Sequence, residues 1–267
     1  MSRPNLLEAL SDNIVVDRDK CIFCGRCAEV CVLDNIRLRL SPCRTACPLG
    51  VNCQGYIQLI ARGDDVKARK LLFESLPFPG ILAQVCSRPC EDACEKKKET
   101  GEAVNIRGLK RYLIEGLDLA EVPLPEMAPP SGKKAAVVGS GPAGMMAAYE
   151  LARHGHAVTV LEAESEPGGM LRWAVPEFRL PLEVLQAEVS RLERMGVKFL
   201  FGARVRGDEL ISLRREFGVV VVATGSGRAL RLNVSGEDLK GVYSGLPFLR
   251  LVREGAGPKL PGRVVVV

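Results

Sequence analysis

Four cysteines lie close together near the start of the chain, Cys21, Cys24, Cys27 and Cys31, separated by two, two and three residues. Thiolates bind both zinc and iron–sulfur clusters, and closely spaced cysteines supply several ligands with little loss of backbone entropy. Three cysteines at successive two-residue gaps are less usual for zinc, so the spacing favours a 4Fe–4S cluster. In the bacterial ferredoxin run with this spacing the fourth cysteine binds a different cluster, and Val32 stands where that run usually has proline.

Six more cysteines follow in two groups, and all ten cysteines precede residue 95. A single free cysteine often packs as a small apolar side chain, but ten in one third of a chain would make an unusual core. The first residues lack the basic and apolar regions of a secretion signal, so we expect a reducing, cytoplasmic location and cluster binding rather than disulfides. The two groups are Cys43, Cys47 and Cys53, and then Cys86, Cys90 and Cys94.

Composition excludes several other classes of protein. The chain has 267 residues, of which 47% are hydrophobic, which suits one large domain or two ordinary ones. No apolar run is long enough to predict a membrane-spanning helix. The net charge of +5 is spread along the chain, and the few aromatic residues (5%) are not interleaved with basic ones, so no nucleic-acid partner is expected.

The cysteine-containing part is predicted to be helical, with the thiols on loops. Apolar residues recur at helical spacing through Gly55–Pro77, which predicts two short helices broken near Gly63, and a third helix begins near Ile106. A proline-rich stretch, Glu121–Lys134, predicts a surface linker. Beyond it the pattern changes to alternating strands and helices, which indicates an α/β fold.

A glycine-rich turn follows the first of these strands. Residues 135–138 form an apolar run typical of a buried parallel strand, and Gly139, Gly141 and Gly144 make the G-x-G-x-x-G pattern. The first glycine permits a sharp turn, the second lets the backbone approach a pyrophosphate at a helix N-terminus, and the third lets helix and strand pack closely. Because the strand and the helix are both in place, the motif predicts a dinucleotide site.

The residues after this motif favour FAD over NAD. A second strand, Ala157–Leu161, ends at Glu162, where a carboxylate accepts the ribose hydroxyls and disfavours a 2′-phosphate, so NADP is not expected in this pocket. A second glycine pair follows directly in "EPGGML" (Glu166–Leu171), and "GVVVVATGS" (Gly218–Ser226) reads as a buried strand ending in a turn of small residues. Both features are more typical of two-dinucleotide flavoproteins than of simple NAD dehydrogenases.

Several longer segments resemble one known family. They are "PCRTACPLGVNCQGYI", "LPFPGILAQVCSRPCEDAC", "AVNIRGLKRY", "VVGSGPAG", "EPGGMLRWAVPEFRLP" and "VVVATGS", in the family's order. Residues 41–267 thereby resemble the first part of the glutamate synthase small subunit, together with its relatives, the amino-terminal part of dihydropyrimidine dehydrogenase and the large subunit of the electron-bifurcating transhydrogenase. The resemblance implies a helical iron–sulfur domain, a Rossmann-like FAD domain and a second Rossmann-like domain that binds NADPH.

The resemblance also implies domain bounds and site residues. The opening cysteine spacing gives a ferredoxin-like 4Fe–4S motif at 1–40. The resemblance suggests a helical iron–sulfur domain at 41–120, a linker at 121–133, an FAD-binding domain at 134–262, and at 263–267 the first strand of a pyridine-nucleotide domain. Arg179 matches a family arginine that contacts the flavin nucleotide. Cys47, Cys86 and Cys90 match ligands of one cluster, and Cys43 and Cys94 match ligands of another. The implied FAD-binding residues are Gly139, Gly141, Pro142, Ala143, Gly144, Glu162, Gly169, Met170, Arg179, Val205, Thr224 and Gly225.

The cysteines depart from the family pattern in two places. Two further family ligands lie just upstream of the Cys43 position, where this chain has "NIRLRL" without a thiol. The opening motif either supplies replacements or holds a cluster of its own. A glutamine ligand of some members falls on Lys110, whose ammonium cannot bind iron; Cys53 either takes that place or is a buried spare. Two clusters are favoured, since three would need twelve ligands.

These features predict an NAD(P)H-linked electron-transfer flavoprotein subunit with 4Fe–4S clusters and FAD. Because "GRVVVV" (Gly262–Val267) resembles the first strand of the family's NADPH domain, NAD(P)H is expected to bind outside this chain, and another polypeptide or chain segment is expected to cover that strand. The expected partner is a catalytic or redox subunit of a larger oxidoreductase. Ferredoxin is a second candidate partner for electron exchange. The alternatives are a non-catalytic electron-relay or assembly module and a complete glutamate synthase small subunit.

Overall fold

The computed structural model describes residues 7–9, 16–17, 20–21, 26–29, 36–38, 41–119, 122–260 and 262–267. Cys24, Cys31 and Val32 lie outside these residues. The chain divides into two compact units, Met1–Leu117 and Asp118–Val267. In the part of the chain that is described, no helix is both long and apolar enough to cross a bilayer.

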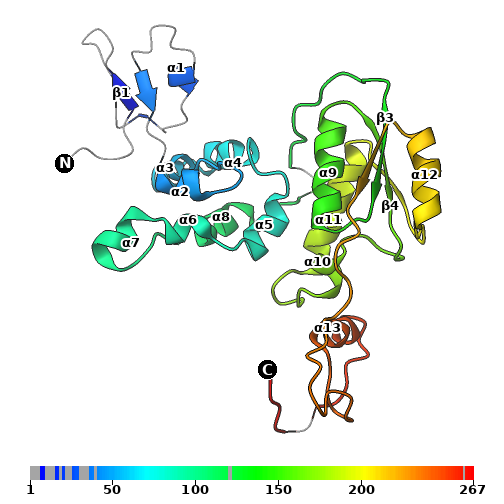
Figure 1. The fold of residues 1–267 in the computed structure, drawn as a ribbon. Coiled ribbons are helices and arrows are strands. Elements are labelled where there is room, and N and C mark those ends of the chain that lie inside the picture. Colours follow the sequence, from blue (N-terminus) through cyan, green and yellow to red (C-terminus); the bar gives the residue numbers. More distant parts are fainter. Residues whose placement is uncertain are drawn as a thin grey trace. The chain divides into compact units, whose positions relative to one another are not determined.

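The first unit is mainly helical (Figure 1). Its short elements are the antiparallel pair β1 (Leu7–Ala9) and β2 (Ile36–Leu38) and helix α1 (Arg26–Glu29). The remaining helices are α2 (Pro42–Ala46), α3 (Cys53–Ala61), α4 (Asp65–Phe73), α5 (Pro79–Val85), α6 (Pro89–Asp92), α7 (Glu95–Thr100) and α8 (Ile106–Ile114). The predicted break is confirmed, because Gly63 has φ +74° between α3 and α4, and the predicted helix from Ile106 is α8.

Side-chain caps fix where the three longer helices begin. Asn52, Asp64 and Asn105 each accept a hydrogen bond from a backbone N–H in the first turn of α3, α4 and α8, at 2.9, 3.1 and 2.9 Å. The helices pack around fully buried apolar side chains such as Leu72 and Leu113. Tyr56, which is 1% exposed, donates from its hydroxyl to the Ile106 carbonyl at 2.9 Å and so ties α3 to the start of α8.

The prediction that loops carry the thiols is only partly right. Cys43, Cys53 and Cys90 lie in the first turns of α2, α3 and α6, and Cys47, Cys86 and Cys94 are helix-cap residues. Proline begins α2 and α6, where its missing N–H costs no hydrogen bond, and the helix therefore starts one residue before the cysteine. Short helices in place of loops give these side chains fixed directions.

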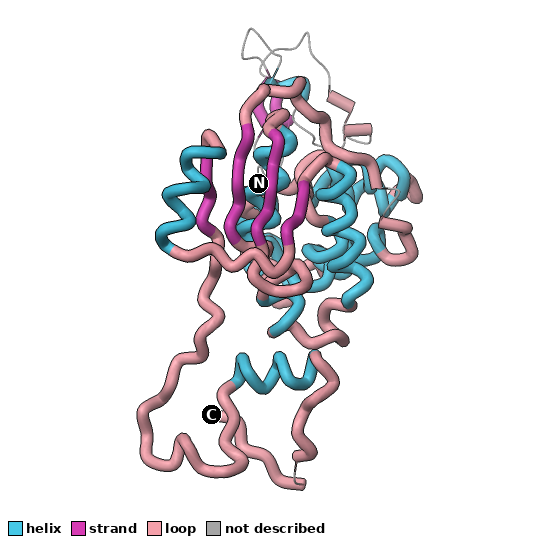
Figure 2. Tube along the Cα trace, turned by 90° about the vertical axis from the view of Figure 1, so that its right-hand side faces the viewer, coloured by secondary structure: helices cyan, strands magenta, loops and turns pink. Residues whose placement is uncertain are grey.

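The second unit contains a four-stranded parallel sheet in the order β5-β4-β3-β6. Its strands are β3 (Lys134–Val138), β4 (Ala157–Leu161), β5 (Lys198–Leu200) and β6 (Val219–Val222), and its helices are α9 (Pro142–Arg153), α10 (Met170–Trp173), α11 (Leu182–Arg194), α12 (Gly207–Glu216) and α13 (Gly245–Arg253). Figure 2 shows α13 beyond the carboxyl ends of the strands, reached from β6 by a long irregular segment. A parallel sheet built from strand–helix–strand units confirms the predicted α/β class.

Two predicted strands differ from the structure. The strand in 218–226 is shorter and lies at the sheet edge, so Val219 and Val222 are 49% and 58% exposed rather than buried. Residues 263–267 form no strand, because no strand pairing of the described residues includes them and a strand needs a neighbour for its backbone hydrogen bonds.

Candidate functional site

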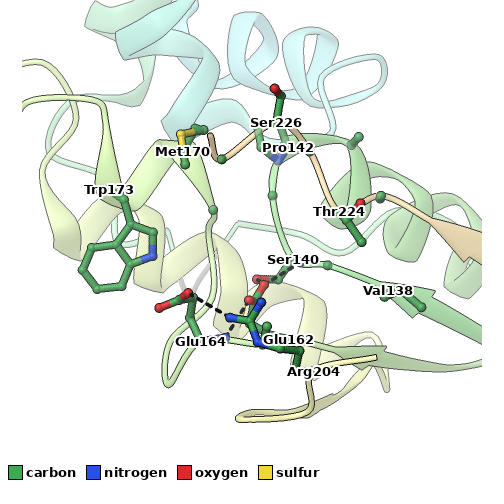
Figure 3. Close-up of a pocket in the computed structure, with 18 of the residues that line it drawn as sticks. Val138, Ser140, Pro142, Glu162, Glu164, Met170, Trp173, Arg204, Thr224 and Ser226 are labelled. Atoms are coloured by element: carbon green, nitrogen blue, oxygen red, sulfur yellow. Dashed lines mark hydrogen bonds and ion pairs between the residues drawn. The ribbon is translucent and has the colours of Figure 1, made fainter. Parts of the chain in front are cut away.

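A pocket of about 830 Å³ opens at the carboxyl ends of β3, β4 and β6 (Figure 3). Ligands of open parallel sheets bind at this edge, because the loops that follow the strands converge there. Ten of the twelve residues expected to bind the dinucleotide line it: Gly139, Gly141, Pro142, Ala143, Glu162, Gly169, Met170, Val205, Thr224 and Gly225. Gly144 and Arg179 do not line it.

The glycines are required by close backbone contacts. Gly139 has φ +100°, and a Cβ there would lie 2.5 Å from the Ala223 carbonyl oxygen. A Cβ at Gly144 would collide with the Gly139 carbonyl oxygen, so this glycine lets α9 pack against the turn. Gly144 therefore shapes the pocket from outside, as its place in the motif predicts.

Two glycine loops meet at the entrance to α9. Gly169 has φ +51°, and a Cβ on it would lie 2.8 Å from the Gly141 Cα. Gly141 is the N-cap of α9, so the unpaired N–H groups of the first turn of this twelve-residue helix lie at the pocket wall. This bare backbone beside a helix N-terminus suits a pyrophosphate.

Glu162 lies at the end of β4 and is 7% exposed. Its Oε2 accepts hydrogen bonds from the Ser140 backbone N–H at 2.8 Å and from the Ser140 hydroxyl, and its Oε1 accepts one from the Glu164 N–H at 2.9 Å (Figure 3). A carboxylate offers about four acceptor positions, so these three bonds fix the side chain and leave capacity for a ribose hydroxyl. Ser140 was not predicted, although it occupies the second position of the glycine motif.

The pocket also contains cations that the sequence did not predict. Arg204, Arg228 and Arg250 line it, whereas Arg179 is exposed outside it. Arg250 comes from α13, and its guanidinium is 2.7 Å from a Glu164 oxygen and 4.6 Å from the centre of the Trp173 ring. No local pattern marks Arg250, because its partner Glu164 is 86 residues away in the chain.

The Glu164–Arg250 ion pair attaches α13 to the loop after β4. The hydrogen bond from Arg250 lowers the pKa of Glu164, and the same bond raises the pKa of Arg250. Two backbone contacts add to this attachment: Arg253 donates to the Arg172 carbonyl at 2.9 Å and to the Leu180 carbonyl at 3.1 Å. A carboxyl with a lowered pKa contributes stability above its ordinary pKa, and that contribution disappears as the pH falls through the lowered value.

Substitution Glu164→Gln is expected to weaken the attachment of α13 by roughly 1 kcal/mol. Trp173, the single tryptophan, lies against Arg250, so its fluorescence reports the position of α13. The variant should differ from the wild type at pH 7, and the wild type should approach the variant only as the pH falls through the lowered pKa of Glu164, which lies below the ordinary value of 4.5. Glu254→Gln is the control, because Glu254, the C-cap of α13, pairs with Arg250 four residues away and does not tie the helix to another segment. Identical spectra of wild type and Glu164→Gln would show that the ion pair does not hold the helix.

In the first unit, three thiols from three helices meet. The Cys53 thiol hydrogen-bonds with those of Cys43 and Cys90, and these bonds lower the pKa of Cys43 to about 6 and that of Cys90 to about 7. The same two bonds, followed by burial, raise the pKa of Cys53. Lys110, 8% exposed, is a further cause of the lowered Cys90 pKa. The lowered pKa favours the thiolate form, in which cysteine binds clusters.

The other described cysteines differ in exposure. Cys21, Cys47 and Cys86 are half-buried, Cys27 is exposed and Cys94 is buried. The Arg88 backbone N–H, held by a left-handed conformation with φ 66°, points to the Cys86 sulfur at 3.5 Å. Among the described residues, no three histidine, cysteine or carboxylate side chains surround a single metal-ion position. Cys47, Cys86 and Cys94 cap short helices of the same unit that carries Cys43, Cys53 and Cys90.

Comparison with known proteins gives a separate family match for each of the two structural units. Residues 8–121 match the model described as dihydropyrimidine dehydrogenase domain II, 4Fe-4S cluster, and residues 137–185 match that of an NAD(P)-binding Rossmann-like domain. The glutamate synthase [NADPH] small chain of Mycobacterium tuberculosis is 34% identical over 212 residues, which cover 78% of this chain and 43% of that protein. The chain is thus similar to the glutamate synthase small-subunit and dihydropyrimidine dehydrogenase family over most of its length.

Other relatives are subunits of larger oxidoreductases. The NADP(+)-dependent formate dehydrogenase subunit beta of Moorella thermoacetica is 33% identical over 252 residues, 85% of this chain and 36% of that protein. The NADPH-Fe(3+) oxidoreductase subunit beta of Geobacter sulfurreducens is 34% identical over 235 residues, 85% of this chain and 35% of that protein. The chain therefore spans a third to under half of the length of these relatives, and it carries the family's 4Fe–4S region and its first Rossmann-like region.

Proposed function

We propose that this chain is an electron-transfer flavoprotein subunit that binds FAD in the pocket of the second unit and 4Fe–4S clusters in the first. It moves electrons between NAD(P)H and a partner redox subunit or ferredoxin. The observation that carries the proposal is the pocket, where two glycine loops, a helix N-terminus and a buried carboxylate converge. The family match over residues 8–121 supports the clusters.

The pocket residues bind and orient the proposed dinucleotide. The backbone at Gly141 and Gly169 leaves room for the pyrophosphate, and the first N–H groups of α9 face its negative charge. Glu162, held by Ser140, accepts hydrogen bonds from the ribose. Arg204 and Arg228 add positive charge at the same wall.

The proposed cofactors supply the redox chemistry: a flavin accepts two electrons as a hydride and passes single electrons to iron–sulfur clusters. The chain provides N–H groups such as that of Arg88, whose hydrogen bond to the Cys86 sulfur would stabilise the reduced cluster. The reduced thiols that clusters require also support a cytoplasmic location as part of the proposal.

Anaerobic purification of the chain tests the proposal directly. We expect flavin absorption that survives gel filtration, together with inorganic sulfide and roughly eight irons per chain, the content of two clusters. Iron without retained flavin would instead support an electron-relay module. A colourless protein with stoichiometric zinc would contradict both.

Substitution Glu162→Gln is expected to weaken FAD binding by roughly 10- to 100-fold, because a hydrogen bond to a charged acceptor contributes about 1.5–3 kcal/mol. The amide NH2 also faces a donor in either orientation, the Ser140 pair at one position or the Glu164 N–H at the other. Flavin fluorescence titration measures the affinity. Glu209→Gln, at an exposed helix cap, is the matched control. Equal FAD affinities of the wild type and Glu162→Gln would show that the Glu162 carboxylate does not contribute to FAD binding.

A further inference from the structure

We propose that Cys53 is an iron ligand and completes the cluster bound by Cys47, Cys86 and Cys90. The inference rests on the proposed function, since it concerns a residue of the iron–sulfur unit. The family pattern assigns no role to the Cys53 thiol. Some family members have a glutamine ligand where this chain has Lys110, and the inference is that Cys53 supplies the ligand in its place.

The surroundings of Cys53 are unlike those of an ordinary core cysteine. Cys53 is 3% exposed at the first position of α3, where an apolar side chain would pack against other apolar groups. Its thiol instead contacts the thiols of Cys43 on α2 and Cys90 on α6. Three sulfurs from three different helices have no packing advantage, but sulfurs that face one another are what a shared cluster requires.

Lys110 cannot supply the missing ligand but can balance a cluster's charge. Its side chain is buried at 8% exposure on α8 and forms no salt bridge to a carboxylate among the described residues. A buried cation needs a nearby anion, and Lys110 interacts electrostatically with the Cys90 thiol. A cluster with four thiolate ligands is anionic, so the lysine ammonium fits beside it while the fourth sulfur comes from another residue.

Cys53 is suitably placed to be that residue. It reaches Cys90, which the family pattern assigns to the three-cysteine set, and Asn52 fixes the start of its helix through a 2.9 Å hydrogen bond to the Gly55 N–H. Ligation forms one Fe–S bond and releases the thiol proton to solvent, with no change in oxidation state. The other contact, Cys43, belongs to the second set.

Two substitutions at this position distinguish a ligand from a core residue. Cys53→Val preserves an apolar side chain of similar size, whereas Cys53→Ser preserves a polar atom that can bind iron. If Cys53 is a ligand, Cys53→Val should lose about half of the iron and sulfide of a two-cluster protein, and Cys53→Ser should retain more. If Cys53 is only a core residue, Cys53→Val should keep full iron and Cys53→Ser should be the less stable variant. Electron paramagnetic resonance of the reduced protein should show one cluster signal lost from Cys53→Val.

Two further variants fix the assignment. Leu59→Val, a 4% exposed core residue on the same helix, should keep its iron and controls for general loosening of α3. Because Cys53 and Cys86 are proposed to share one cluster, the Cys53→Val/Cys86→Ser double variant should lose no more iron than either single variant. Additive losses would overturn this assignment. A wild-type protein without iron would refute the proposed function, whereas iron retained in both the wild type and Cys53→Val would refute this inference alone.

Discussion

The Gly169→Ala variant is expected to bind FAD at least about 100-fold more weakly than the wild type while its iron content stays unchanged. Gly169 has φ +51° and ψ −130°, a conformation that residues with a Cβ rarely adopt and that costs roughly 1–3 kcal/mol. The added Cβ would also lie 2.8 Å from Gly141 Cα and 3.3 Å from Gly141 N, so the two loops must separate. Fluorescence titration of the flavin and an iron assay on the same preparation measure both effects.

Gly207→Ala is the matched control for this variant. Gly207 begins α12, has no positive φ, and a Cβ built on it meets no atom within 4 Å. Its FAD affinity should equal that of the wild type. Normal flavin binding by Gly169→Ala would show that the cofactor does not pass between the two glycine loops.

The Arg191→Ala variant is expected to destabilise the second unit by about 3–5 kcal/mol, the usual cost of breaking a buried ion pair. Glu188 and Arg191 on α11 are 0% and 3% exposed, and their closest charged atoms are 3.7 Å apart. Arg191 also donates to the Pro123 carbonyl at 3.0 Å and so holds the proline-rich linker against the helix. Removing the guanidinium leaves a buried carboxylate and releases the linker.

Thermal unfolding followed by circular dichroism should show a Tm lower by roughly 10 °C for Arg191→Ala. Arg194→Ala is the control, because this arginine is exposed, unlike Arg191, and makes a similar 3.2 Å bond to the Val122 carbonyl. Its cost should stay within about 1 kcal/mol. The Glu188→Leu/Arg191→Met double variant should recover most of the lost stability, because it removes both charges. If the double variant is as unstable as Arg191→Ala, the effect comes from linker contacts rather than from the buried charge.

The glycine motif could be predicted from the sequence because its chemistry is local. Gly139, Gly141 and Gly144 lie within six residues, and their roles follow from the geometry of one strand–turn–helix unit. The end of β4 at Leu161 placed Glu162 beside that turn by the same reasoning. These features depend on backbone conformation over short distances, which residue types specify directly.

Exposure along β6 and the positions of the thiols could not be predicted in this way. Val219–Val222 has the composition of a central strand, and only the sheet order places it at an edge. The cysteine spacing indicated cluster ligands, but the start of each short helix decides which sulfurs meet. Cys53 and Cys90 are 37 positions apart and come together because α3 and α6 both pack next to α2 and α8.

The sequence by itself therefore determined the order of the two units, the dinucleotide turn and the set of thiols available to bind iron. The tertiary structure alone decided that Arg250 rather than Arg179 lines the pocket and that Cys53 faces Cys43 and Cys90. The physical reason is the distance along the chain over which each kind of interaction acts. Turn and helix preferences act over a few residues, whereas an ion pair such as Glu164–Arg250 forms only after chain segments 86 residues apart have packed together.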